Sequence, residues 1–216
     1  NASAAKPHGA LTRITTHPAI DQRPTLSRDG NHIAWETSRG RDFEVWAKDL
    51  ASGKETQISK GPLREHMPAL SPDGSKLVYD THDGDKVTVL EASFDGGPST
   101  RIREENIGQG SFQFTADAKQ ALYFHRAPPG TVGLIHLQTK QRTPLLRHPK
   151  FNLSLADARL SPDGRWIYYS SDQTGQLEIW RMPAAGGTSQ QITTTGGAYM
   201  KFSPDGKWIF YRQKAG

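Results

Sequence analysis

The 216-residue chain contains no cysteine. This absence excludes disulfide frameworks, thiolate zinc sites and cysteine nucleophiles, but it does not settle the compartment, because many extracytoplasmic and cytosolic domains also lack cysteine. The uninterrupted apolar runs are only a few residues long, so the sequence predicts no membrane span. No stretch shows a sustained helical period with capping residues, which favours β-structure throughout.

The charged residues do not gather into one patch. Lys and Arg number 27 against 22 Asp and Glu, which gives a formal net charge of +5. A nucleic-acid-binding surface would place its basic residues on one stripe with aromatic residues interleaved, whereas here they are scattered through nearly every segment. The sequence therefore predicts a solvated basic surface and no contact with nucleic acid.

A short turn motif recurs five times at nearly even spacing. The copies occupy residues 27–30, 71–74, 115–118, 161–164 and 203–206, and their aspartates lie 44, 44, 46 and 42 residues apart. In the form Ser-Pro-Asp-Gly, proline presets φ, Asp accepts hydrogen bonds from nearby amides, and Gly adopts positive φ without a Cβ clash. The third copy, Thr-Ala-Asp-Ala, lacks both Pro and Gly, so we expect a looser or differently shaped turn there.

The strand after each turn is apolar on both faces, as in Ile33-Ala34-Trp35 and Leu77-Val78-Tyr79. Such a strand must lie between two neighbouring sheets. Third and fourth strands follow in each complete repeat, and four short strands with this period define a propeller blade. The sequence predicts an all-β fold, a β-propeller of four-stranded blades with four complete repeats and a split or truncated fifth blade.

The two ends of the chain leave the ring size open. We interpret residues 1–10 as a linker or expression remnant and residues 11–216 as the propeller domain, which we expect to belong to a larger propeller or multidomain protein. Residues 11–15 match the fourth-strand pattern, so a closed five-bladed ring completed by this strand is the alternative. The last strand, residues 207–213, would present an open blade edge, which predicts self-association.

The segments Leu-Ser-Pro-Asp-Gly-Arg-Trp-Ile-Tyr-Tyr-Ser-Ser-Asp at residues 160–172 and Glu-Ile-Trp-Arg-Met at residues 178–182 resemble the PD40, or TolB-like, repeat of the WD40-like propellers. The resemblance covers residues 11 to 213 and is specific for fold but not for function. It implies a bacterial protein. Proteins with similar repeats include the periplasmic TolB component of the cell envelope, sensors or regulators, the gating propeller of prolyl-oligopeptidase-type peptidases, and oligogalacturonate lyases with a channel metal.

No residue pattern marks a catalytic site. A hydrolase of the elbow type needs Gly-x-Ser-x-Gly, and the sequence contains none. No histidine pair has short metal-ligand spacing, so a metal site would have to assemble across blades. Enzyme activity therefore stays undecided, with binding favoured, and we name no catalytic residue, metal ligand or cofactor. A divalent metal in the central channel is the open alternative.

The innermost strands begin near the central channel, and there the repeats differ most. Polar residues at these variable positions would converge on one end of the ring and form a ligand-binding rim. The candidate residues are Arg23, Glu65, His66, Gln109 and Asp157. The simpler interpretation is a solvated rim with water-mediated pairs, which every propeller has.

Rigid stacked repeats with variable loops suit recognition better than chemistry. The sequence therefore predicts a non-enzymatic scaffold for a protein or peptide partner, as a module of a TolB-like envelope, sensor or regulator protein. The alternative is the propeller of an enzyme, either a lyase with a channel metal or a peptidase gating domain. The resemblance favours a periplasmic or other extracytoplasmic location, with the cytoplasm as the alternative.

Overall fold

The computed structural model describes residues 11–40, 42–106, 112–125, 130–148, 158–203 and 205–213, and these residues form five antiparallel sheets. Within this part of the chain there is no helix, so none that could cross a membrane. Four sheets have four strands each and the fifth has two, which confirms the predicted all-β propeller with a partial fifth blade.

Each blade follows the chain outward from its innermost strand. Blade 1 consists of β1 (Asp21–Leu26), β2 (His32–Thr37), β3 (Glu44–Asp49) and β4 (Glu55–Gln57). Blade 2 consists of β5 (Arg64–Leu70), β6 (Lys76–Asp83), β7 (Lys86–Ser93) and β8 (Thr100–Asn106). Blade 3 consists of β9 (Phe112–Phe114), β10 (Gln120–His125), β11 (Gly130–His136) and β12 (Arg142–His148). Blade 4 consists of β13 (Ala158–Leu160), β14 (Trp166–Ser171), β15 (Glu178–Pro183) and β16 (Gln190–Gln191).

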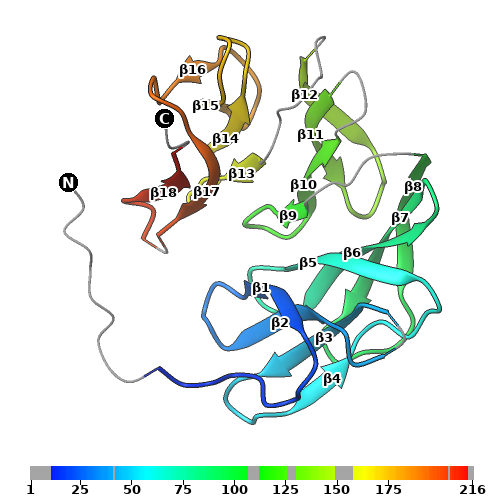
Figure 1. Cartoon of the computed structure of the whole chain (residues 1–216). Helices are drawn as coiled ribbons and strands as arrows, with labels where there is room; N and C mark the ends of the chain where they lie inside the picture. Colours follow the sequence, from blue (N-terminus) through cyan, green and yellow to red (C-terminus); the bar gives the residue numbers. More distant parts are fainter. Residues whose placement is uncertain are drawn as a thin grey trace.

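The fifth sheet pairs β17 (Ala198–Phe202) with β18 (Ile209–Arg212). The five sheets lie around a common centre, which β1, β5, β9, β13 and β17 face (Figure 1). We call the side of each sheet that faces the preceding blade its leading face, and the side that faces the following blade its trailing face.

The repeated turn is a closed hydrogen-bonded unit. In the first copy, Ser27 Oγ donates to Asp29 Oδ1 at 2.5 Å and accepts the His32 amide at 3.0 Å. The Gly30 amide bonds the Ser27 carbonyl at 3.1 Å, with Gly30 at φ 75°. The same bonds recur in the other four copies, so each Asp serves its turn as the sequence indicates.

The third turn has the same shape as the others, so the prediction of a looser turn is wrong. Ala118 adopts φ 54°, and its amide bonds the Thr115 carbonyl at 2.9 Å. Thr115 Oγ1 donates to Asp117 Oδ1 at 2.6 Å, as serine does in the other copies. These side-chain bonds hold Ala118 in a left-handed conformation that alanine otherwise avoids.

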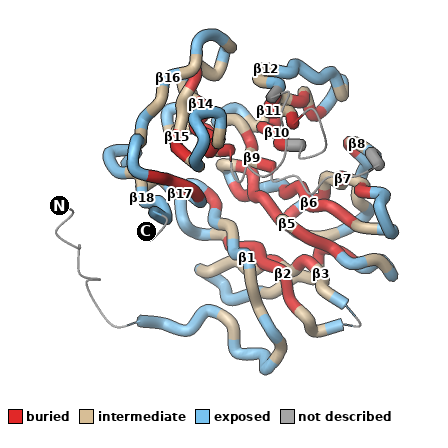
Figure 2. Tube along the Cα trace, turned by 45° about the horizontal axis from the view of Figure 1, so that its top comes forward, coloured by how far each residue is buried: buried red, intermediate tan, exposed pale blue. Residues whose placement is uncertain are grey.

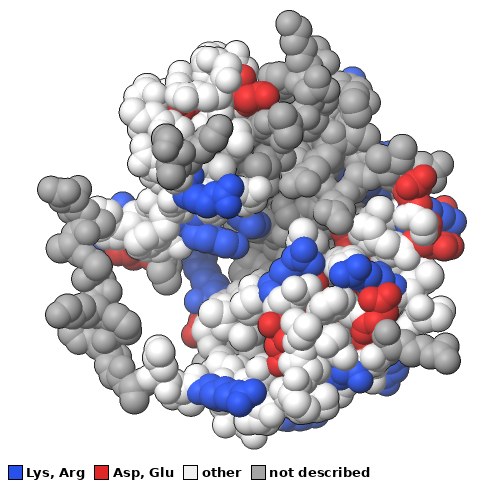
Figure 3. All heavy atoms as spheres, in the orientation of Figure 1, with Lys and Arg blue, Asp and Glu red and all other residues white. Residues whose placement is uncertain are grey.

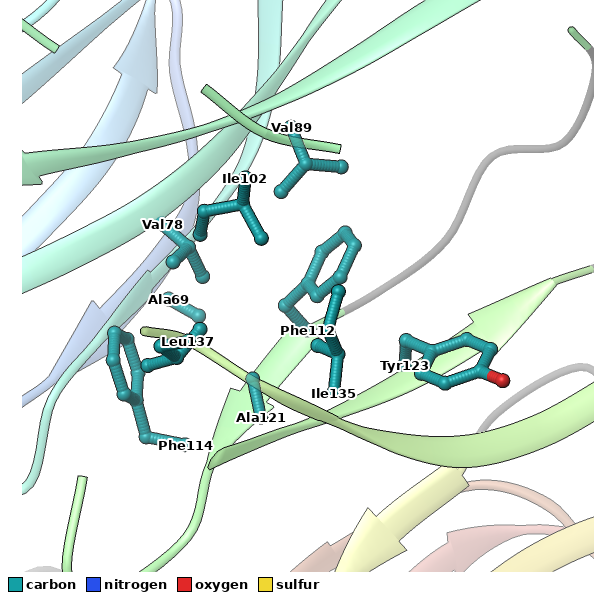
Figure 4. Packing of buried hydrophobic residues seen from close by; sticks show 10 residues of the cluster. All are labelled: Ala69, Val78, Val89, Ile102, Phe112, Phe114, Ala121, Tyr123, Ile135 and Leu137. Atoms are coloured by element: carbon teal, nitrogen blue, oxygen red, sulfur yellow. The ribbon is translucent and has the colours of Figure 1, made fainter. Parts of the chain in front are cut away.

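The core lies between the blades, as Figure 2 shows by the buried strands in the interior of the ring. Neighbouring residues on β6 belong to two different interfaces: Leu77 lies in a buried cluster with Ala34 of blade 1, whereas Val78 lies in one with Phe112 of blade 3. Leu77 and Val78 are both fully buried. Figure 4 shows the second interface, with Val78, Val89 and Ile102 of blade 2 directed toward the aromatic rings of blade 3.

Residues 11–15 form no strand that would complete the last blade, which contradicts the alternative of a five-bladed ring closed by this segment. These residues adopt no regular structure, and the Ile14 carbonyl accepts a hydrogen bond from Lys48 Nζ of blade 1 at 2.9 Å. Further along, the Ile20 amide bonds Ser38 Oγ at 3.0 Å. The segment is thus held by side chains of the first blade and not by β18.

Two turn glycines with the same backbone conformation allow a matched test. A Cβ at Gly30 (φ +75°) would meet nothing within 4 Å, but one at Gly74 (φ +72°) would lie 2.4 Å from His32 Nδ1 of blade 1. We expect Gly30→Ala to cost about 1 kcal/mol of unfolding free energy through the left-handed backbone alone. Gly74→Ala should cost roughly 1–3 kcal/mol more, because the His32 ring must move. Equal losses in chemical denaturation would contradict the inter-blade contact.

Candidate binding site at the channel mouth

Three of the innermost strands, β1, β5 and β17, share a kink near their first residues, at the end of the ring that we call the mouth. Arg23, Met67 and Tyr199 occupy equivalent repeat positions, and their φ values of 50°, 53° and 57° are left-handed. The pairing register of β1, β5 and β17 shifts at these points, which marks each as a β-bulge. Bulges re-aim side chains and are frequent next to functional sites. Arginine, methionine and tyrosine have no preference for positive φ, so the sequence alone does not predict these bulges.

Glu36 of β2 holds the mouth between blades 1 and 2 together. Its side chain is fully buried, and Oε2 lies 2.8 Å from Arg23 Nη1 while also accepting Gln22 Nε2 at 2.9 Å. Oε1 accepts the bulged Met67 amide of blade 2 at 2.8 Å. Burial alone would raise the pKa of Glu36, but bonds from His66, Met67 and Gln22 and the Arg23 charge lower it below its usual value.

Two histidines and a second buried carboxylate continue this cluster on blade 2. His66 Nδ1 lies 3.4 Å from Glu36 Oε2, and its ring meets the His82 ring edge-on at 5.0 Å. His82 Nε2 lies 3.4 Å from Oδ1 of Asp80, which is fully buried. Burial raises the pKa of Asp80, and the neighbouring Asp80 raises the pKa of His82.

Asp80 is the repeat equivalent of Glu36, six residues after the turn glycine position. Glu36 serves the inner strand of the next blade through the Met67 amide, whereas Asp80 lies beside His82.

Two arginine side chains, those of Arg23 and Arg64, are accessible to solvent at the mouth. The side chain of Arg23 is 44% exposed although its guanidinium contacts a fully buried carboxylate. Arg64 is 46% exposed, and its guanidinium lies over the Phe43 ring at 5.0 Å, with Asp42 Oδ1 3.5 Å from its Nε. Phe43 in turn stacks on His66 with ring centroids 6.4 Å apart. Figure 3 shows basic side chains around the centre of the ring on the face in view.

Glu65 lies behind the mouth, in a socket between blades 1 and 2. Its Oε2 accepts Ser59 Oγ at 2.7 Å and its Oε1 accepts the Gly61 amide at 3.3 Å. Between blade 4 and the fifth sheet, Glu178 fills the equivalent socket with bonds from Thr193 Oγ1 at 2.5 Å and the Gly196 amide at 2.9 Å. A glutamate thus supplies the same acceptor at these two junctions, from β5 at the first and from β15 at the second.

The structure brings together Arg23 and His66 among the predicted rim residues, at 3.4 Å between Nη1 and Nδ1. Glu65 is adjacent in sequence but points into its socket, and only 2% of it is exposed. Gln109 and Asp157 lie outside the described residues. The residue that sequence reasoning missed is Glu36. Its signal was a charged residue that directly follows the apolar run Ile33-Ala34-Trp35 in the same strand.

Among the described residues, no group of three or more histidines and carboxylates is arranged to hold a metal ion. The His66, His82, Asp80 and Glu36 side chains are instead paired with one another and with Arg23 across the two blades. This arrangement can present hydrogen-bond donors and positive charge to a ligand at the mouth.

No family model matches the chain. An uncharacterised protein of Agrobacterium fabrum is 54% identical over 33 residues, which are 15% of this chain and 11% of that protein. Solved structures match over most of the chain. TolB from Acinetobacter baumannii superposes with a TM-score of 0.77 at 18% identity, over 94% of this chain and 51% of that one.

A putative TolB from Agrobacterium tumefaciens gives a TM-score of 0.71 at 21% identity, over 92% of this chain and 71% of that one. An oligogalacturonate lyase in complex with manganese gives 0.67 at 16% identity, over 89% and 58%. The chain thus spans about half the length of the first TolB structure. These likenesses show that the fold is a TolB-like propeller, and at such identities they show the fold alone.

The Glu65 socket predicts a pH dependence of stability. Burial, with repulsion from Glu44 and Asp42, raises the Glu65 pKa from 4.5 to about 7 in the folded chain. Between these values the folded state binds more protons than the unfolded state, so this site's contribution is full below 4.5 and is lost as pH rises to about 7. The loss amounts to roughly 3 kcal/mol.

The Glu65→Gln variant keeps an acceptor for Ser59 but cannot ionise. We expect its unfolding free energy, relative to the native sequence, to be higher at about pH 8 than at about pH 4.5 by roughly the amount lost at this site. Urea denaturation at both pH values measures this difference. Parallel pH profiles for the two proteins would contradict the buried, proton-binding carboxylate.

Proposed function

We propose that the chain is a non-enzymatic propeller scaffold that binds a protein or peptide partner at the mouth between blades 1 and 2. The observation that carries the proposal is a pair of half-exposed arginine side chains: Arg23 is bonded to the buried Glu36, and Arg64 lies over the Phe43 ring. A binding surface gains affinity when its donors are fixed before the partner arrives, because less conformational entropy is then lost.

The chemistry of the mouth favours a partner that carries carboxylates. Four innermost strands contain a basic residue, namely Arg23, Arg64, Arg159 and Lys201. Arginine binds carboxylates bidentately, and the Phe43 and His66 rings offer an apolar surface beside it. An acidic peptide in an extended conformation meets both requirements.

A peptide-display selection on the immobilised chain tests the proposal. Selected peptides should be rich in Asp and Glu and should bind an Arg23→Gln/Arg64→Gln variant about tenfold or more weakly, because charge-assisted hydrogen bonds are lost. The matched control is Arg165→Gln. This arginine is 78% exposed and follows the turn between β13 and β14, at the end of blade 4 away from the mouth. Selected peptides that bind all three proteins equally would place the binding surface elsewhere.

The resemblance to TolB-like repeats leads us to propose an extracytoplasmic location and a role in an envelope, sensor or regulator protein. The likeness to an oligogalacturonate lyase in complex with manganese supports a second candidate, a lyase with a channel metal. Incubation with oligogalacturonate and Mn²⁺ separates the two. Release of unsaturated products, abolished by His66→Ala, would favour the enzyme, and its absence would favour the scaffold.

A further inference from the structure

Asp80 and His82 of β6 form an ion pair at the mouth. Asp80 is fully buried, yet neither of its carboxylate oxygens has a hydrogen-bond partner among the described residues. Its one ion-pair contact in this part of the chain is His82 Nε2, 3.4 Å from Oδ1. Glu36, at the equivalent repeat position, is instead bonded by Arg23 and by the Met67 amide. A buried carboxylate with so few donors is costly as an anion, which favours a proton on the pair.

The pair lies beside the basic residues of the mouth. In the register of β5 and β6, His82 stands opposite Arg64. Asp80 stands opposite His66 in the same register. The His66 ring meets the His82 ring edge-on at 5.0 Å, and His66 Nδ1 lies 3.4 Å from Arg23 Nη1. The charge of the pair therefore acts on the two arginines to which the proposed function assigns ligand binding.

The groups around the pair determine how it binds a proton. The neighbouring Asp80 carboxylate raises the pKa of His82, although the Arg64 charge opposes this rise. Burial raises the pKa of Asp80, and the Glu36 carboxylate adds to this rise. On the other side of β6, strand β7 places the apolar Val87 opposite His82. Whichever residue carries the proton, the pair is neutral with it and negative without it.

We propose that the Asp80–His82 pair is a proton switch for ligand binding at the mouth. When the pair takes up one proton as pH falls, a negative charge beside Arg64 disappears. The mouth then binds the carboxylates of an acidic peptide more tightly, and it releases them as pH rises. The inference rests on the proposed function, because it assigns regulation to that same binding surface.

A second proton-binding residue, Glu65, must be distinguished from this pair. Burial raises its pKa to about 7, so it titrates in the same pH range. Its carboxylate points into the socket formed by Ser59 and the Gly61 amide. Because its ionisation also adds a negative charge behind the mouth, the matched control is the Glu65→Gln variant.

The experiment measures the affinity of the full chain for N-acetylated hexaglutamate with a neutral C-terminal fluorophore. Anisotropy is recorded at about pH 6 and about pH 8.5 and at low ionic strength, which limits screening. The side chains of the probe have pKa values of about 4.3, so they stay charged over this range. The native sequence should bind roughly threefold to tenfold more tightly at the lower pH.

The variants assign this pH dependence to its source. Asp80→Asn should bind at the higher pH about as tightly as the native chain binds at the lower pH, because no negative charge is left beside Arg64. Glu65→Gln should keep most of the native difference. An NMR titration of the unbound chain follows His82 itself, whose signal is the one lost in His82→Gln. Its midpoint should lie above the ordinary value of 6.5 and should fall in Asp80→Asn.

Four results would overturn the switch: equal affinities at both pH values, a pH dependence that Asp80→Asn leaves unchanged, one that Glu65→Gln abolishes, or a native His82 midpoint that is not above 6.5. These results would leave the proposed function intact, because Arg23→Gln/Arg64→Gln would still weaken binding at every pH. Absence of binding at both pH values would overturn the proposed function, and the switch with it.

Discussion

The second strand of every blade carries apolar side chains on both faces, and the rest of the structure depends on covering them. Leu77 and Val78 belong to different interfaces although they are adjacent in β6. A single sheet cannot bury both, so each blade requires a neighbour on either side. Stacking of blades places the innermost strands side by side, which in turn brings Arg23 and Glu36 of one blade against His66 and Met67 of the next.

Most of the fold was predictable from the sequence because it rests on local chemistry that is repeated five times. The serine, aspartate and glycine of four turns make the expected bonds, and strand alternation indicates which residues are buried. The third turn was not predictable from its missing Pro and Gly, because Thr115 and Asp117 supply the side-chain bonds that hold Ala118 left-handed. Residues 11–15 form no strand, and the Ile14 carbonyl bonds Lys48 of blade 1 instead. A strand pattern in the sequence does not predict this contact.

The candidate site was predictable only in part. The alignment of repeats found the variable positions, and Arg23 and His66 do meet. It could not show the bulges, because arginine, methionine and tyrosine have no preference for positive φ. It also could not separate Glu65, which fills a socket, from its neighbour His66 at the mouth. Glu36 was the detectable signal, since a carboxylate in an apolar strand needs donors around it.

The central claim is that blades are stable because neighbours cover both of their faces. Native-state hydrogen exchange, measured where the chain is monomeric, tests it most directly. The amides of β6, which is covered on both faces, should exchange slower than those of β18 by a factor on the order of 100. The amides of β14 should resemble those of β6, since the fifth sheet covers its trailing face. Equal protection of β18 and β6 would contradict the account, because β18 is covered on one face only.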